Sequence, residues 1–531
     1  MKCEAEYPDV LQASTLSSMF DASFEAYGNH IALSCENVQL SYRNLDFLSR
    51  NLAAYLQSLL KLSPGDRVAV MLPNSLQYCL SVIAVLRAGM VVVNINPHAT
   101  GYETSKFIHD SGARVIITLS SLVRLFRHDD MLHVIEADTN IPFSADSDDI
   151  TAGPYQKNHV RFDVALHGGR FHRMTRPTIA RDSLAFLQYT GGTTGIPKAA
   201  MLSHANIMSN LIQLKTVCGD HVRCCDERVI TALPLYHIFS LTVNFLFFTA
   251  IGGTNILISD ARNTTNILNA MQRFRFTAIA GVNTLFSHLI THPDIRSVDF
   301  SFLRFCVSGG TELTRRVAEQ WLNITQKNIL VGYGMTECSP LISVQSFDTT
   351  DCHDNAGFPV ADTNIRIIDA EGRNVTNGEK GEVLVRGPQV MSGYWNRPDE
   401  TRAVLNDGWF ATGDLATRDD SGCLKLEGRK KEMIIVSGFN VYPGEIESVL
   451  LQHPAISEAA VTGVQNDVTG EAICAFIVIR ADNTATEHDV REHCRLYLTS
   501  YKIPGRIHFL DAIPKSGVGK ILKYKLKEMF P

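Results

Sequence analysis

A glycine- and threonine-rich segment at residues 189–198 (YTGGTTGIPK) has the composition of a loop that binds phosphate. It directly follows an apolar, strand-like run at residues 184–188. Its three glycines let the backbone approach an anion, and its three threonines and Lys198 can donate hydrogen bonds to phosphate oxygens. The segment lacks the GxxxxGKS or GxxxxGKT spacing of a P-loop and the GxGxxG spacing of dinucleotide-binding folds. We therefore predict a phosphate-binding loop of another type, with an ordinary turn as the alternative.

Four further motifs that carry polar side chains follow along the chain, at residues 333–337 (YGMTE), 408–414 (GWFATGD), 428–432 (GRKKE) and 514–520 (PKSGVGK). Other types of catalytic site are excluded. No GxSxG sequence marks the nucleophile of a hydrolase, and His488 and His493 lack the HExxH spacing of a zinc site.

The elements that must position these motifs follow an α/β rhythm. Apolar runs at 68–72 and 91–95 flank a helical pattern at 75–87, which predicts parallel strands joined by crossover helices. Between about residues 127 and 181 the pattern weakens into polar and glycine-containing sequence, and we expect a surface excursion there that carries no chemistry. Strand-like runs, each followed by a helical pattern, return at residues 184–188, 229–233, 277–280 and 305–308 and predict a second α/β layer.

The pattern of predicted secondary structure changes in the last third of the chain. Short alternating strands at about 356–426 predict a small β subdomain. The charged GRKKE segment then reads as a linker to a smaller α+β domain with a helix at 442–451 and strands at 459–464 and 472–479. The predicted fold class is α/β: a large N-terminal domain (1–430) with two parallel-sheet layers and the β subdomain, followed by a small mobile C-terminal domain (431–531).

Length and charge limit the function. A chain of 531 residues should hold at least two cores. Its 55 acidic and 49 basic residues give a net charge of −6, so no general positive field exists to hold nucleic acid. The 12 cysteines include no CxxC pair and predict reduced thiols in a cytosol, and acidic residues near the N-terminus (Glu4, Glu6 and Asp9) argue against an export signal.

One stretch, residues 239–258, carries no charge and is long enough to span a bilayer. It also contains two asparagines, three threonines and a glycine pair. We therefore expect a buried helix followed by a buried strand, with a membrane span or a membrane-dipping surface as the alternatives.

The five motifs, in this order, resemble those of the adenylate-forming enzymes, which include acyl-CoA synthetases, luciferases and the adenylation domains of peptide synthetases. The resemblance runs from about Phe20 to Lys527 and is greatest to bacterial long-chain fatty-acid–CoA ligases, as in LPLYHIFSLTVN, GPQVMSGYWNRP and VSGFNVYPGEIE. It implies attack of a carboxylate on the α-phosphate of ATP to give an acyl-adenylate and pyrophosphate, followed by attack of the CoA thiol. The implied cofactors are ATP, Mg²⁺ and CoA.

The resemblance also implies roles for particular residues. Thr190 and Glu337 match magnesium-associated positions, and a hydroxyl with a carboxylate suits this hard cation. Tyr333 offers an aromatic face to adenine, Asp414 can accept hydrogen bonds from the ribose hydroxyls, and Arg429 offers a donor fork. The full predicted nucleotide-binding set is Thr190, Gly191, Gly192, Thr193, Thr194, Gly195, Lys198, Gly309, Gly310, Thr311, Glu312, Tyr333, Gly334, Met335, Thr336, Asp414, Arg429 and Lys520.

Lys520 is implied as the principal catalytic residue, because a lysine on the small GVGK loop can swing in and neutralise charge as the carboxylate approaches the α-phosphate. The thiol must later reach the same carbon, so the C-terminal domain should rotate about a hinge at Lys431. The rotated state would present Ser437, Gly438 and Phe439 to CoA. Solvated-surface and turn roles are the alternatives for Lys520 and Gly438.

The acyl group is expected to bind near His237. Amino-acid-activating relatives carry an aspartate at the His237 position, and no acid occurs here between Glu227 and Asp260, so an amino-acid substrate is disfavoured. An apolar slot could bind a long alkyl chain at ~0.8 kcal/mol per buried CH₂, although the same side chains could instead be core. The predicted lining is His237, Phe239, Leu241, Val243, Phe247, Gly281 and Val282, and His237 is also assigned to the catalytic set with Lys520, Glu337 and Thr190.

Departures from the family pattern are few: Ala199 replaces the usual glycine after the phosphate loop, and the linker reads GRKKE in place of DRKKD. The expected partners are a fatty acid, ATP and CoA in the cytoplasm. Contact with the inner membrane face and a homodimer are left open, as are chain-length preference and pathway. Two rival functions also stay open: an acyl-AMP ligase that loads a carrier protein, and a non-catalytic acyl or nucleotide sensor.

Overall fold

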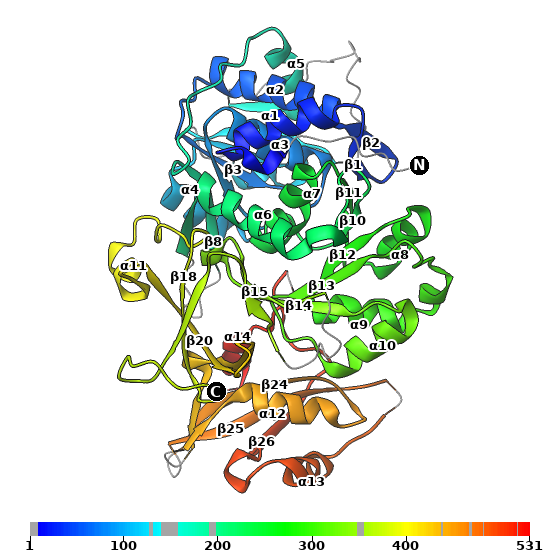
Figure 1. Ribbon diagram of the computed structural model, residues 1–531, viewed down its shortest axis with the longest axis vertical. Helices are drawn as coiled ribbons and strands as arrows, with labels where there is room; N and C mark the ends of the chain where they lie inside the picture. Colours follow the sequence, from blue (N-terminus) through cyan, green and yellow to red (C-terminus); the bar gives the residue numbers. More distant parts are fainter. Residues whose placement is uncertain are drawn as a thin grey trace. The chain divides into compact units, whose positions relative to one another are not determined.

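The computed structural model describes residues 9–126, 131–139, 158–190, 198–347, 355–436, 439–466, 470–481, 483–517 and 519–530 (Figure 1). The chain divides into two compact units. The first comprises Met1–Cys352, Pro359–Thr363 and Gly387–Leu405, and the second comprises His353–Phe358, Asn364–Arg386 and Asn406–Pro531. The second unit therefore contains most of the small β subdomain as well as the C-terminal domain, and the boundary expected at residue 430 stays a prediction.

The first unit contains a seven-stranded sheet in the order β7-β6-β5-β3-β4-β8-β9, and all neighbouring strands are parallel except β8 and β9. Its strands are β3 (Arg67–Met71), β4 (Val91–Asn94), β5 (Val115–Leu119), β6 (His133–Ala137), β7 (His159–Arg161), β8 (Leu184–Thr190) and β9 (Lys198–Ser203). Helices α1 (Leu16–Tyr27), α2 (Tyr42–Ser58), α3 (Leu76–Arg87), α4 (Gly101–Ser111) and α5 (Phe162–Arg170) belong to the same region (Figure 1). The crossover helix expected at 75–87 is confirmed as α3, with Ser75 as its N-cap.

The expectation of a surface excursion between residues 127 and 181 is wrong in its described parts, because these contain a helix and two strands of the sheet. Strands β6 and β7 extend the sheet at one edge, and α5 packs against α2. The glycine pair in α5 looked like a turn signal, but Gly169 lies so close to α2 that a Cβ would come within 1.8 Å of the Asn51 carbonyl oxygen. These glycines therefore serve helix packing. Residues 127–130 and 140–157 of this stretch lie outside the described residues.

A larger sheet in the same unit contains the order β15-β14-β13-β12-β10-β11-β1-β2. Its strands are β1 (Ile31–Cys35), β2 (Val38–Ser41), β10 (Arg228–Thr231), β11 (Thr254–Leu257), β12 (Ala278–Gly281), β13 (Phe305–Gly309), β14 (Ile329–Gly334) and β15 (Leu341–Val344). The strands from β14 to β1 run parallel. Helices α6 (His204–Cys218), α8 (Thr264–Arg273), α9 (Asn283–Thr291), α10 (Arg315–Thr325) and α11 (Pro398–Val404) complete the unit. The second α/β layer is thus confirmed.

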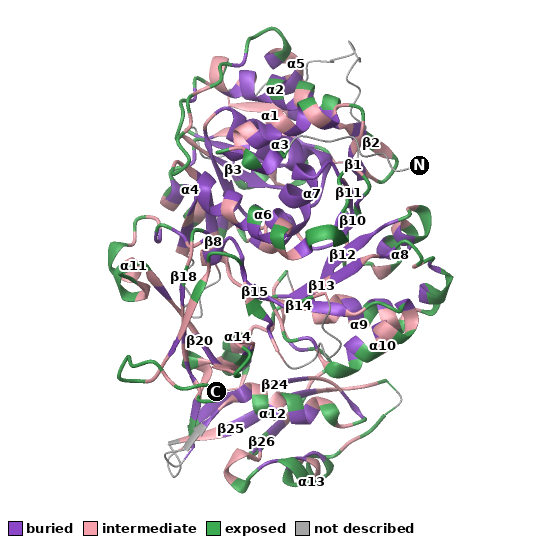
Figure 2. Cartoon of the chain, in the orientation of Figure 1, coloured by how far each residue is buried: buried purple, intermediate pink, exposed green. Residues whose placement is uncertain are grey.

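The uncharged stretch 239–258 is a buried helix followed by a buried strand, as expected. A π-helical segment, η4 (Ser240–Leu246), runs into the short helix α7 (Phe247–Ala250), and β11 follows. Figure 2 shows α7 among the buried elements. None of the helices that the structure describes is both long and apolar enough to cross a bilayer.

The second unit contains two sheets. One is antiparallel and includes β17 (Asn364–Ile368), β18 (Gly381–Arg386), β20 (Trp409–Arg418) and β21 (Leu424–Arg429). The other contains β22 (Ile434–Val436), β23 (Phe439–Val441), β24 (Ile456–Asn466), β25 (Gly470–Ile479) and β26 (Arg506–Phe509), with helices α12 (Pro443–Gln452), α13 (Glu487–Tyr497) and α14 (Lys523–Met529). The β subdomain and the α+β fold of the C-terminal domain match the expectation.

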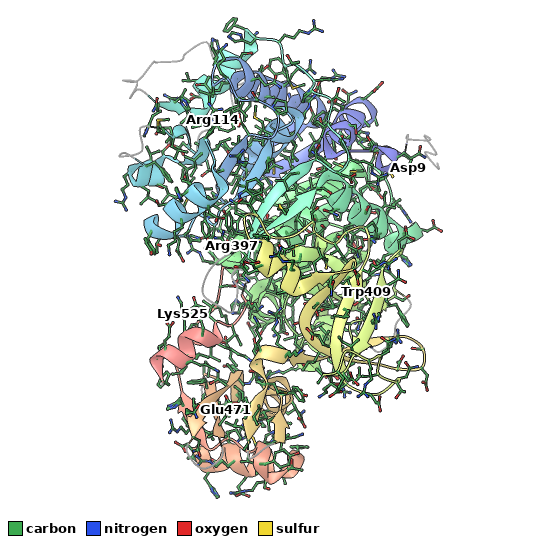
Figure 3. The ribbon with its side chains drawn as sticks, turned by 90° about the vertical axis from the view of Figure 1, so that its left-hand side faces the viewer. Asp9, Arg114, Arg397, Trp409, Glu471 and Lys525 are labelled. Atoms are coloured by element: carbon green, nitrogen blue, oxygen red, sulfur yellow. The ribbon has the colours of Figure 1, made fainter. Side chains whose placement is uncertain are left out.

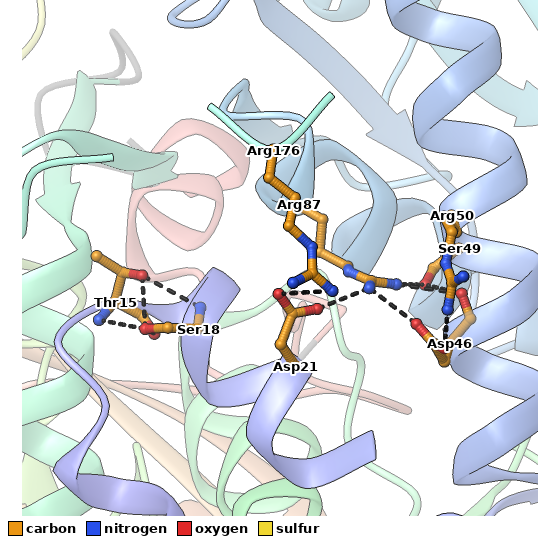
Figure 4. A network of polar contacts seen from close by, with 8 residues as sticks. All are labelled: Thr15, Ser18, Asp21, Asp46, Ser49, Arg50, Arg87 and Arg176. Carbon is orange, nitrogen blue, oxygen red and sulfur yellow. Dashed lines mark hydrogen bonds and ion pairs between the residues drawn. The ribbon is translucent and has the colours of Figure 1, made fainter. Parts of the chain in front are cut away.

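A buried arginine joins three helices of the first unit (Figure 4). Arg87, at the end of α3, is 1% exposed and donates through Nη2 to Asp21 of α1 at 2.6 Å and to Asp46 of α2 at 2.8 Å. Its Nη1 donates to the Ser49 hydroxyl at 2.9 Å, and its guanidinium lies 5.0 Å from the centre of the Phe24 ring. A buried charge is tolerated where it is paired in this way.

Candidate active site

The ends of the predicted phosphate loop are held together by a β-hairpin. Thr190 ends β8 and lies opposite Lys198, which begins β9. The Thr190 hydroxyl donates to the Lys198 carbonyl oxygen at 3.3 Å. The intervening predicted residues Gly191, Gly192, Thr193, Thr194 and Gly195 lie outside the described residues, so their roles stay predictions.

Three neighbouring parallel strands bring further predicted residues to one edge of the larger sheet. Gly281, the last residue of β12, lies opposite Ser308 of β13, and Gly309 lies opposite Gly332 of β14. The carboxyl ends of these strands therefore bring together Val282, the predicted segment Gly309–Glu312 and Tyr333, at an edge where open α/β sheets bind ligands. The hydroxyl oxygens of Ser308 and Thr311 are buried and lack hydrogen-bond partners among the described residues. Because buried polar atoms are normally paired, this edge suits a polar ligand.

The YGMTE motif turns sharply after β14. A Cβ at Gly334 would come within 2.1 Å of the Pro340 carbonyl oxygen, so only glycine fits there. The same oxygen accepts a hydrogen bond from the Met335 amide at 2.9 Å. This turn leads through Thr336 into the short 3₁₀-helix η6 (Thr336–Cys338), which carries Glu337.

Glu337 is contacted by a residue to which the sequence analysis gave no role. The Tyr394 hydroxyl donates to Glu337 Oε1 at 2.8 Å, and the Lys198 ammonium lies 5.3 Å from the centre of the Tyr394 ring. Burial and the neighbouring Glu337 charge raise the pKa of Tyr394 far above its ordinary value, so the phenol remains a neutral donor. The only sign of a role for Tyr394 in the sequence was its place in GPQVMSGYWNRP, a stretch that supported the family resemblance.

Tyr189, next to Thr190, is anchored at Asp110 of α4. The Tyr189 hydroxyl donates to Asp110 Oδ2 at 2.8 Å, and Arg397, labelled in Figure 3, pairs with Oδ1 at 2.9 Å. The Trp395 indole N–H donates to the Asp110 carbonyl oxygen at 3.0 Å. Asp110 therefore fixes both the end of β8 and the segment that follows Tyr394.

The residues around Glu337 fit a magnesium ion bound together with a nucleotide. The Thr190 hydroxyl and the Glu337 carboxylate are hard oxygen donors, and the phenol of Tyr394 contacts only one of the two carboxylate oxygens. No group of three or more His, Cys, Asp or Glu side chains that could hold a metal occurs in the described part of the chain. Phosphate oxygens and water would have to complete the coordination, as is usual for Mg²⁺.

The predicted acyl-binding residues surround η4. His237 Nδ1 accepts from the Phe239 amide at 3.3 Å, and the Phe239 ring lies 3.3 Å from where a Cβ of Gly309 would be. The remaining apolar residues of the set, Leu241, Val243, Phe247 and Val282, are all buried. A π-helix often marks a functional site, because it places an extra residue within the helical turn. Burial agrees with either a slot or a core, so direct contact with an acyl chain stays a prediction.

A buried amide network that the sequence analysis missed holds the segment leading to His237. Gln188 of β8 donates to the Tyr236 carbonyl oxygen at 2.6 Å and accepts from Asn94 at 3.0 Å. The Tyr78 hydroxyl donates to the Leu235 carbonyl oxygen at 2.7 Å and also to Asn94. The strand before the phosphate loop is therefore coupled directly to the segment before His237.

The remaining predicted residues belong to the second unit. Asp414 of β20 lies opposite Arg429 of β21, and Arg429 Nε contacts Asp414 Oδ1 at 2.9 Å. Asp414 is 6% exposed, so the guanidinium orients a carboxylate that is nearly buried. Lys431, the expected hinge, is exposed on the 3₁₀-helix η7 (Lys430–Glu432). Ser437 and Gly438 lie outside the described residues, as does the side chain of Phe439.

Lys520 is exposed near the end of a tight hairpin. The Ser516 amide donates to the Lys520 carbonyl oxygen at 2.7 Å, and the Leu522 amide donates to the Pro514 carbonyl oxygen at 2.9 Å. Lysines anchor both sides of the hairpin: Lys515 pairs with Glu458 at 2.6 Å, and Lys523 pairs with Glu432 at 3.0 Å and Glu447 at 2.8 Å.

The cluster of Lys523, Glu432 and Glu447 ties this hairpin to the linker. Burial alone would lower the pKa of Lys523, but the two carboxylates outweigh it and raise the pKa. Burial alone would raise the pKa of Glu432, but Lys523, together with Arg429 and Lys520, outweighs it and lowers the pKa. The folded structure therefore favours the charged forms of Lys523 and Glu432 at neutral pH.

Replacing Lys523 by methionine should destabilise the protein by on the order of 2 kcal/mol, because it leaves two poorly solvated carboxylates without their partner. The midpoint of urea unfolding is the measurement. Lys515→Met is the matched control, because it breaks a single ion pair, the one with Glu458, where Lys523→Met breaks two, and it should cost roughly half as much. Equal shifts of the two midpoints would contradict the prediction.

The effect of Lys523→Met should also depend on pH. The Glu432 contribution is complete above its unfolded pKa of about 4.3 and is lost as the pH falls through its lowered folded value. The Lys523 contribution is complete below about pH 10.4 and is lost as the pH rises through its raised folded value. The difference between wild type and variant should thus be largest between these limits and shrink in acid.

Comparison with known proteins agrees with this arrangement. A family model described as "AMP-binding enzyme" matches residues 20–395, and one described as "AMP-binding enzyme C-terminal domain" matches residues 445–520. The chain belongs to the AMP-binding enzymes, and the resemblance to adenylate-forming enzymes is confirmed.

Particular relatives cover nearly the whole chain. It is 43% identical over 530 residues to a long-chain-fatty-acid–CoA ligase of Yersinia pestis, covering 97% of this chain and 94% of that protein. A ligase of the same description from Bacillus subtilis is 34% identical, with coverage of 99% and 97%. The crystal structure of ATP-bound MatB from Rhodopseudomonas palustris aligns with a TM-score of 0.85 at 27% identity, covering 97% of this chain and 99% of that one.

Proposed function

We propose that the protein is a long-chain fatty-acid–CoA ligase. It uses ATP and Mg²⁺ to convert a fatty acid to an acyl-adenylate and pyrophosphate, and then transfers the acyl group to CoA, releasing AMP. The observation that supports this most strongly is the similarity over nearly the full chain to proteins of that description. The contact of Tyr394 with both Glu337 and Lys198 adds a physical reason, because it joins the predicted phosphate and metal-binding residues into one site.

The residues of the chain would act mainly by binding and by neutralising charge. Lys198 and the Thr190 hydroxyl bind phosphate oxygens, and the carboxyl ends of β13 and β14 support the adenosine. Mg²⁺, when bound with ATP at Glu337, supplies further neutralisation of the phosphates. The fatty-acid carboxylate and the α-phosphate are both anions and repel each other as they approach. The positive charge of Lys520 counters this repulsion.

Two rival functions are tested by the same assay. An acyl-AMP ligase would release its product to a carrier-protein thiol, and a sensor would form no adenylate. Purified protein is incubated with ATP, Mg²⁺ and carboxylates of increasing length, with CoA or acyl carrier protein as acceptor, and AMP and thioester are measured. We expect CoA thioesters of long-chain acids. Thioester on the carrier protein alone, or no AMP with any acid, would overturn the proposal.

Val243→Trp should shift preference from long to medium acyl chains if the slot runs along η4. Val243 is 9% exposed, and each excluded methylene forfeits ~0.8 kcal/mol, so losing a few should cost ~10²-fold in kcat/KM for long chains. Val298→Trp is the matched control: this valine is 7% exposed but belongs to the core beneath α8 and α9. It should lower the melting temperature without changing the ratio of long- to medium-chain activity.

Gly281 is a poorer position for this test. A Cβ there would come within 2.8 Å of the buried Phe286 ring, so a large side chain would disrupt the core as well as any slot.

An equal loss of short- and long-chain activity in Val243→Trp would mean that η4 packs the core and that the acyl chain binds elsewhere.

The proposed location is the cytoplasm. The ten cysteines that the structure describes are all free thiols, as suits a reducing compartment. Peripheral contact with the inner membrane face and formation of a homodimer are further parts of this proposal. Vesicle flotation and light scattering test them directly.

A further inference from the structure

A short segment before α11 bridges the two sequence motifs of the candidate site. Its Trp395 amide donates to the Ala199 carbonyl oxygen at 2.9 Å, and its Gly393 carbonyl oxygen accepts from the Met201 amide at 2.9 Å, so it pairs with β9. Its Met391 amide donates to the Glu337 carbonyl oxygen at 2.8 Å. The segment thus holds the strand after the phosphate loop against the helical turn that carries Glu337.

Tyr394 lies at the centre of this bridge, and its backbone is fixed on both sides. Its amide donates to the Thr401 hydroxyl at 2.9 Å, and the neighbouring Trp395 is tied to Asp110. Tyr394 as a whole is 9% exposed. A phenol held so firmly presents its hydroxyl to the Glu337 carboxylate in one defined position.

We propose that Tyr394 is a positioning residue for magnesium binding. By donating to Oε1, it holds the Glu337 carboxylate in the orientation that leaves Oε2 for the metal. Without the phenol, the carboxylate must lose torsional freedom when the ion binds, and part of the binding free energy is spent on ordering it. This inference rests on the proposed function, since it requires that Glu337 binds the metal.

The experiment measures binding without turnover. Calorimetry with a non-hydrolysable ATP analogue, in Mg²⁺ and in EDTA, compares wild type with Tyr394→Phe, which keeps the ring beside Lys198 and removes only the hydroxyl. We expect the affinity in Mg²⁺ to fall about tenfold and the affinity in EDTA to change less than about twofold. An equal fall in both conditions, or no fall, would overturn the proposal.

Tyr189→Phe is the matched control, because it also removes a phenol that donates to a carboxylate at 2.8 Å, at Asp110 rather than Glu337. It should change the affinities in Mg²⁺ and EDTA by the same factor. A double-mutant cycle with Glu337→Gln supplies the second test: if Tyr394 acts through Glu337, Tyr394→Phe should have little further effect in that background. Independent losses would overturn the proposal.

The binding measurements distinguish a failure of the proposed function from a failure of this inference. If wild type binds the analogue equally well in Mg²⁺ and in EDTA, the metal role of Glu337 in the proposed function fails. If wild type prefers Mg²⁺ and Tyr394→Phe keeps that preference, only the inference about Tyr394 fails. Should Tyr394→Phe not fold, Tyr394→Gln and Tyr394→Leu replace it. Both lack the ring, and only glutamine can donate to Glu337, so we expect only glutamine to retain part of the preference for Mg²⁺; equal preferences would overturn the inference.

Discussion

Lys520→Ala is expected to slow acyl-adenylate formation by about 10³-fold or more, while the conversion of supplied acyl-adenylate to CoA thioester falls much less. The reason is that two anions, the carboxylate and the α-phosphate, must approach each other only in the first half-reaction, and a preorganised cation in a desolvated site is worth several kcal/mol. Single-turnover measurements of each half-reaction give the two rates separately.

The structure indicates that this substitution should leave the fold intact. The hairpin around Lys520 is held by backbone hydrogen bonds and by the ion pairs of Lys515 and Lys523. Lys525→Ala is the matched control, since this lysine, labelled in Figure 3, is exposed on α14 and loses the same charge. Equal losses in both half-reactions would remove the argument that Lys520 serves only one of two orientations of its domain.

Glu337→Gln should lower ATP-dependent turnover by roughly 10²-fold without unfolding the chain. Glutamine has the same size, and its carbonyl oxygen can still accept the Tyr394 hydrogen bond, so only the charge is removed. The apparent Mg²⁺ requirement should rise with the loss in rate. Glu319→Gln removes an exposed carboxylate of α10 as a control. Unchanged activity of Glu337→Gln at limiting Mg²⁺ would place the metal elsewhere.

Much of the fold was predictable because the apolar pattern that marks a buried parallel strand is local. The runs at 91–95 and 305–308 became β4 and β13 within one or two residues. The α/β class and the enzyme family followed from such runs and from motifs that are contiguous in sequence. The prediction of a surface excursion at 127–181 failed for the opposite reason. The glycines of this stretch serve a contact with α2, and that contact is visible only in three dimensions.

For the candidate site, the sequence allowed roles to be proposed only for residues in contiguous motifs. Residues within contiguous motifs, such as Tyr333 and Glu337, could be proposed from the sequence, and their roles stay predictions; the sheet brings Tyr333 beside the glycines at the end of β13. Tyr394 could not be assigned a role, because its partner lies 57 residues away and a tyrosine in a turn looks like ordinary packing. Gln188 and Asn94 were missed because a single amide in an apolar strand gives no sign of what it contacts.

The buried Arg87 also constrains how this protein can change over generations. Losing the arginine leaves Asp21 and Asp46, each 25% exposed, with Arg176 and Arg50 as remaining partners, whereas losing both aspartates leaves a guanidinium that is 1% exposed without a counter-charge. Neutral replacements at the three positions are therefore more accessible when the arginine changes first. The junction thus favours one order of substitution, in which the basic position becomes neutral before both acidic ones do.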